Sequence, residues 1–153
     1  MTKTFSPVGV DFDVASTVAQ VALNTESLSS AGMGVYVVAA SAVAQYDVVS
    51  IDQAGNAVPI TTTTANNGGR IGFAQVAIAQ NSFATVATEG AGFLISVAAL
   101  APINTRLYTT NTAGTLGASA TSHAEIIGVT IGTSNTGTAT ATTGMANFPH
   151  VDI

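Results

Sequence analysis

The sequence predicts an all-β protein, a small β-barrel or sandwich with an extended N-terminal arm. Two observations lead to this prediction: short runs of β-branched and aromatic residues recur from about residue 34, and turn-forming residues separate them at regular intervals. With 153 residues, the chain is long enough for one domain with a single hydrophobic core and tails.

Residues 1–33 are the first expected unit, an arm that precedes the core. Its apolar residues alternate imperfectly with turn formers, so we expect an extended segment that does not fold alone. Such an arm could add a strand to a sheet edge of a neighbouring subunit or of another protein, or it could fold back on its own barrel. The candidate residues for a contact of the first kind are Phe5, Val8, Val10 and Phe12.

A short helix is the alternative for the second part of this arm. Val14, Val18 and Val21 recur at a spacing that could equally form one helical face. The pattern leaves strand and helix open for this stretch.

Residues 34–144 are expected to form the barrel or sandwich core. The turns Asp52–Asn56 and Asn66–Gly69 supply residues that tolerate positive φ, so each should close a hairpin or a tight loop. In the run 70–78 the large side chains change phase near Gln75, which indicates a bulge or two-sided burial in a central strand. The predicted strands lie at 35–39, 46–51, 57–61, 70–78, 83–88, 92–97, 106–110, 115–118, 124–131 and 136–142.

Residues 145–153 are expected to form a C-terminal tail. This stretch shows no signal for a strand partner, so it should be an ordered strap or a frayed end. The three expected units are therefore an arm, a β core and a tail.

The low charge of the chain bears on its partners. Only 7% of residues are charged, against about a quarter in typical soluble domains, and 47% are hydrophobic. The polar face must then be built mainly from Thr, Ser, Asn and Gln, a surface suited to burial against other subunits. A monomer with a threonine-rich face is the alternative interpretation.

The few charges also disfavour some partners and compartments. Net charge is −5, and the cations are Lys3, Arg70 and Arg106, so direct nucleic-acid binding is not expected. Asp11 and Asp13 stand where a signal peptide would be apolar, and no stretch has the length of a membrane span. We expect synthesis in the cytoplasm and no membrane partner.

Candidate catalytic and metal-binding residues are sparse. The chain has no cysteine, and neither histidine lies in a Gly-x-Ser-x-Gly pattern. His123 beside Ser122 and Glu125, and His150 near Asp152, offer two potential ligands each, fewer than a metal site needs. We therefore expect no enzyme activity, no cofactor and no metal.

Two further motifs have ordinary structural interpretations. Asp47 and Asp52 flank one predicted strand, where acids commonly solubilise a strand edge. Gly90-Ala91-Gly92 is only a fragment of a dinucleotide-binding fingerprint, and a turn or kink in a β region explains it better.

Short, largely apolar pieces follow one another along the chain at 46–60, 70–78, 86–90, 92–97, 105–110 and 126–129. In this order they resemble the capsid cement, or decoration, proteins of tailed bacteriophages, which are small head proteins with a β-barrel core. The similarity covers about residues 34–132, and it lies in the order of the pieces more than in any one of them. The arm residues named above would then be candidate capsid contacts.

This resemblance implies a structural virion protein on the outer capsid surface. It would bind the major capsid protein and bridge neighbouring shell subunits, frequently as a homotrimer, and it carries over no catalytic residue. The alternatives are another β component of the virion, such as a tail-tube, fibre or baseplate domain, or a carbohydrate-binding or adhesin module, which the missing Trp disfavours.

Overall fold

The computed structural model describes residues 12–29, 32–65, 69–135, 137–138 and 140–152. In this part the chain is all-β, which confirms the fold class predicted from the sequence. These residues contain no helix. The strands are β1 (Ala15–Ser16), β2 (Glu26–Ser29), β3 (Gly32–Ala39), β4 (Val48–Ile51), β5 (Asn56–Pro59), β6 (Arg70–Phe73), β7 (Phe83–Val97), β8 (Leu107–Thr109), β9 (Leu116–Gly117), β10 (Glu125–Ile131) and β11 (Thr140–Val151).

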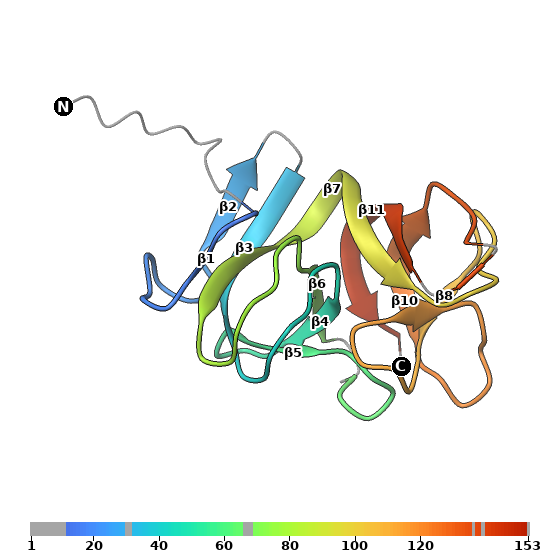
Figure 1. Ribbon diagram of the computed structural model, residues 1–153, viewed down its shortest axis with the longest axis horizontal. Helices are drawn as coiled ribbons and strands as arrows, with labels where there is room; N and C mark the ends of the chain where they lie inside the picture. Colours follow the sequence, from blue (N-terminus) through green and yellow to red (C-terminus); the bar gives the residue numbers. More distant parts are fainter. Residues whose placement is uncertain (1–11, 30–31, 66–68, 136, 139, 153) are drawn as a thin grey trace.

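The strand pairings close into two rings that share β7, the long strand that runs from one lobe to the other in Figure 1. The first half of β7 pairs with β3, which is followed by β5, β4 and β6, and β6 returns to β7 through Phe73 and Ala87. We call this ring the N-terminal barrel. Its β3–β5 pairing is parallel, and the others are antiparallel.

The second ring, the C-terminal barrel, starts from the other half of β7. That half pairs with β11, then β10, β8 and β9 follow, and β9 returns to β7 through the parallel pair Val97–Leu116. The barrels are also joined by His150 of β11, which lies opposite Arg70 of β6. One long β strand thus serves as a wall of both barrels.

Glycines let β7 pass from one barrel to the other. Gly90 and Gly92 have φ of 123° and 88°, values that L side chains rarely adopt. The β7–β11 register shifts at this point, between Gly144 and Met145. The Gly90-Ala91-Gly92 segment is therefore a bend inside a strand, not a phosphate-binding turn.

Two hydrophobic cores lie on the two faces of β4, all four of whose residues are buried. Val49 and Ile51 belong to the core of the N-terminal barrel, whereas Val48 belongs to the larger core that fills the C-terminal barrel. Strand β6 sends Ile71 and Phe73 into that larger core as well. Because successive side chains of a strand point to opposite faces, β4 separates the two cores.

The run 70–78 is shorter as a strand than the sequence predicted. Strand β6 ends at Phe73, because the Gln75 side chain turns to β7, where it accepts from the Leu94 amide and donates to the Leu94 carbonyl, both at 3.0 Å. Beyond it, Ile78 forms an isolated bridge with Val43 in the N-terminal core. The phase change at Gln75 thus marks two-sided burial, one of the two alternatives.

The expected C-terminal tail needs correction. Residues 145–151 are the second half of β11, paired with β7 and β10, and Ala146 and Val151 are buried. Ala146 is small, and the buried positions of β11 are irregularly spaced. A search for large apolar residues at alternate positions therefore does not detect this half of the strand. Likewise, no helix forms over residues 14–22, and Val14 and Val18 are exposed.

Candidate functional site

The four arm residues proposed from the sequence have different outcomes. Phe5, Val8 and Val10 lie outside the described residues. Phe12 is half-buried and packs against the larger core, and its ring lies so close to Gly34 that a Cβ there would collide with it. For Phe12, this placement corresponds to an arm that folds back on its own barrel.

The first histidine group, His123 with Ser122 and Glu125, lies at the start of β10. His123 Nδ1 lies 2.8 Å from the Thr62 hydroxyl, and Glu125 binds Arg106 at 3.2 Å. Ser122 occupies a turn with φ of 60°. The side chains of His123 and Glu125 are thus engaged with different neighbours.

The second group is also held by its own chain. His150 Nδ1 lies 2.9 Å from the Phe148 carbonyl, and His150 stands opposite Arg70 in the sheet. The Asp152 amide donates to the Glu125 carbonyl. Within the described ranges, no three His, Cys, Asp or Glu side chains are grouped as a metal site would require.

The two carboxylates around β4 shape loops. Asp47 accepts a bond from the Ala44 amide at 2.8 Å, and burial raises the pKa of its carboxyl. Asp52 accepts bonds from the side chain and backbone of Asn56 and from the Ala54 amide, and these bonds lower its pKa. Asp52 therefore organises the hairpin turn between β4 and β5, as its Asp-to-Gly sequence predicted.

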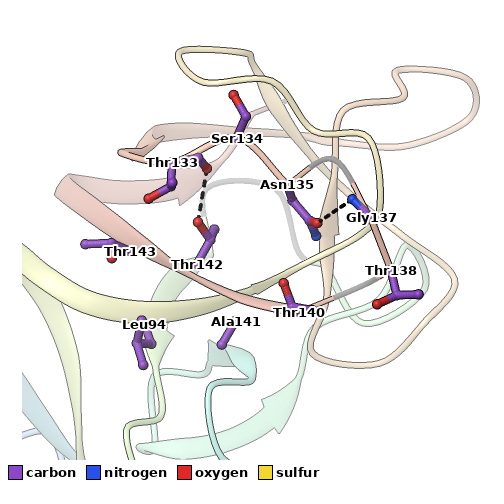
Figure 2. Close-up of a pocket in the computed structure, with 10 residues that line it drawn as sticks. All are labelled: Leu94, Thr133, Ser134, Asn135, Gly137, Thr138, Thr140, Ala141, Thr142 and Thr143. Atoms are coloured by element: carbon purple, nitrogen blue, oxygen red, sulfur yellow. Dashed lines mark hydrogen bonds between the residues drawn. The ribbon is translucent and has the colours of Figure 1, made fainter.

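A threonine-lined hollow of about 440 Å³ lies beside β11 (Figure 2). Two of its polar side chains bind the protein itself: the Thr142 hydroxyl donates to the Thr133 carbonyl at 3.0 Å, and the Asn135 side-chain oxygen accepts from the Gly137 amide at 3.3 Å. The Asn135 amide also donates to Val97 and Ala98 carbonyls. The bonds from Asn135 hold the loop that follows β7, so this side chain has a structural role.

An exposed apolar surface lies where β11 of the C-terminal barrel meets β6 of the N-terminal barrel. Phe148 of β11 is 73% exposed and has a left-handed backbone with φ of 48°. It borders a hollow of about 340 Å³ whose walls include Met33, Glu89, Pro149 and the Arg70–Glu26 ion pair. We call this surface the Phe148 face.

A bulge in β11 presents Phe148. Ile127 pairs with His150 and Val129 with Ala146, so Gly128 alone lies opposite residues 147–149. Gly128 has φ of 80°, and a Cβ there would collide with the Asn147 carbonyl oxygen. The bulge, which needs Gly128, turns Phe148 outward while Pro149 returns to the interior.

A second exposed apolar residue lies at the other end of the C-terminal barrel. Leu100 is 74% exposed with φ of 62°, and it borders a hollow of about 350 Å³ lined mainly by small residues, among them Ala98, Gly117 and Ala118. Its loop is fixed by bonds from Asn135 to Ala101 and the residues before it. We call this surface the Leu100 face.

Sequence reasoning missed both faces. Ala101-Pro102 indicated a break in structure, but nothing in the local pattern shows that Leu100 points to solvent. The sequence places Phe148 and Pro149 in a tail, because the strand that pairs with them is not evident from their own segment.

No helical segment of the described chain combines the length and apolar character that a bilayer-spanning helix needs. In comparisons with known proteins, the chain matches no family model, no curated protein and no solved structure.

Proposed function

We propose that the chain is a non-enzymatic structural virion protein that decorates the head of a tailed bacteriophage and cements its capsid. It would bind the major capsid protein on the outer surface and bridge neighbouring shell subunits. It would act as a self-associated protein, a homotrimer as the sequence resemblance implies.

One observation supports this proposal most: large apolar side chains lie exposed on a molecule that has very few charges. Phe148, Leu100 and Val18 are 73%, 74% and 65% exposed, while only 7% of residues are charged. Large exposed apolar side chains on a surface with few charges are typical of surfaces that become buried against other proteins.

The fold also suits a mechanical role. We expect two barrels that share β7 and have buried residues on both faces of β4 to resist local opening, because the packing of each barrel then depends on the other. A rigid body that binds several shell subunits adds free energy only to the assembled shell and so shifts the equilibrium toward it. Many copies on a lattice gain avidity from individually weak contacts.

The same features would serve another virion component, such as a tail-tube, fibre or baseplate domain. An antibody against the chain, applied to virions of the encoding phage, separates these possibilities by electron microscopy. We expect label over the head. Label confined to the tail would favour the alternative, and unlabelled intact virions would refute a surface role.

Binding to the shell can be tested directly. Heads assembled without this chain should gain additional density on their outer surface after incubation with the purified protein, and they should withstand heat or osmotic shock better. Heads that gain neither density nor stability would contradict cementing. The carbohydrate-binding alternative predicts signals on a glycan array instead.

A further inference from the structure

We propose that the hollow beside Phe148 receives an arginine side chain of the protein to which the chain binds. The inference rests on the proposed function, because it names the chemistry by which the Phe148 face would hold a shell subunit. It does not depend on self-association.

The charge of the hollow is the first argument. Its walls carry two carboxylates, those of Glu26 and Glu89, and one guanidinium, that of Arg70. Glu26 and Arg70 bind each other at 2.7 Å, so these two charges offset each other. The Glu89 carboxylate forms no hydrogen bond or ion pair with any other described residue, although Glu89 is only partly exposed. A carboxylate in such a recess attracts a cation that can also donate hydrogen bonds to it.

The aromatic ring at the rim is the second argument, and it favours arginine over lysine. Phe148 is 73% exposed at the β11 bulge, where its backbone has φ of 48°. A planar guanidinium stacks on an aromatic face and can form two parallel N–H bonds with one carboxylate, whereas a lysine offers a point charge. Met33, half-buried in the wall, supplies apolar atoms for the methylene stem of the arginine.

The third argument concerns the source of the cation. The chain has three cationic side chains, and its described residues include two of them. Arg70 is bound to Glu26, and the other described arginine, Arg106, is bound to Glu125. The third cation, Lys3, lies outside the described residues and is not an arginine. A second copy therefore brings no unpaired arginine, and a chain with a net charge of −5 favours a basic partner.

Methionine methyl groups can report on the hollow directly. Met33 lines it, whereas Met145 is 55% exposed and lies outside its walls. Protein that is isotope-labelled at the methionine methyl groups is titrated with N-acetylarginine amide and observed by NMR. The citrulline and lysine analogues are titrated in parallel, since citrulline keeps the shape of arginine without its charge. We expect a saturable shift of the Met33 signal with the arginine compound, binding at least about fivefold weaker for both analogues, and an unchanged Met145 signal.

Two variants and a control identify the side chains that bind. Glu89→Gln removes the charge but keeps the shape, and Phe148→Ser removes the ring, so each should weaken arginine binding. Asp13→Asn removes one charge at an exposed residue outside the hollow and should have no effect. Heads assembled without this chain should bind Glu89→Gln and Phe148→Ser at least about tenfold more weakly than wild type or Asp13→Asn. Circular dichroism checks that each variant is folded.

The outcomes separate this inference from the proposed function. Wild-type protein that does not bind heads refutes the proposed function. If heads bind wild type and both variants equally, the shell contact lies on another surface and this inference is wrong. A Met33 signal that does not move, that responds equally to citrulline or lysine, or that moves equally in Glu89→Gln overturns the arginine site. A shift of Met33 caused by Lys3→Gln alone would place the chain's own arm in the hollow and overturn it as well.

Discussion

Adjacent valines of β4 offer a test of how the two barrels depend on each other. Val48 and Val49 are both fully buried, but Val48 packs in the larger core and Val49 in the core of the N-terminal barrel. We expect Val48→Ala and Val49→Ala to destabilise the whole chain to a similar degree, because β4 contributes side chains to both cores and pairs with β6, which in turn pairs with β7 and β11.

The size of the effect follows from the groups removed. Each substitution removes two methyl groups, about 1.6 kcal/mol at ~0.8 kcal/mol per buried carbon. The cavity that remains raises the loss to about 2–3 kcal/mol, because the surrounding barrels relax only in part. For a chain of this length, such a loss lowers the Tm by about 5–10 °C, at ~2–4 °C per kcal/mol.

Urea unfolding, followed by far-ultraviolet circular dichroism and by tyrosine fluorescence, measures both variants. Val18→Ala is the matched control, since the same groups are removed from a side chain that is 65% exposed, and it should change stability by less than about 0.5 kcal/mol. Two separate transitions, or a loss in one variant only, would show that the barrels unfold independently and would refute the reasoning.

Three further predictions concern single residues. Phe12→Ala should lower the free energy of unfolding by about 1–2 kcal/mol, because the half-buried ring packs on Gly34, and an unchanged urea midpoint would argue against that contact. Gly128→Ala should cost about 2 kcal/mol or more in thermal unfolding, because its Cβ meets backbone at a positive φ, whereas Gly137→Ala, which meets open space, should be nearly neutral. Asp52→Ala should cost about 1 kcal/mol at pH 7. Folding lowers the pKa of Asp52, so the stabilisation by its carboxylate is present above the ordinary carboxyl pKa and is lost as the pH falls. The difference in unfolding free energy between wild type and Asp52→Ala should therefore shrink in acid. A difference that does not change with pH would contradict a role of the ionised carboxylate.

Most strand positions could be predicted because their signals are local. The turn at Asp52 closes its hairpin through bonds to residues only two and four positions away, so the residues that decide it are adjacent in the sequence. Strand β3 was predicted from its own run of β-branched residues, and the structure extends it only slightly.

The candidate site could not be predicted in the same way. Phe148 is exposed because β11 bulges opposite Gly128, which lies twenty positions earlier, and Leu100 is exposed because Asn135 holds its loop. A sequence pattern predicts that a large apolar residue is buried. That such a residue is exposed becomes evident only when the strand that pairs with its own strand is known. For Phe12 the sequence left two placements open, and contact with Gly34 decides between them.

By itself, the sequence determined the all-β class, the turns that separate the strands and the low charge of the chain. Alternating apolar residues and turn residues act locally, and composition does not depend on folding at all. Only the tertiary structure decided that β7 is shared by two barrels, that β4 divides two cores, and that Phe148 and Leu100 project at opposite ends. These features depend on which distant strands meet and in what register, and register is set by the packing of the whole chain.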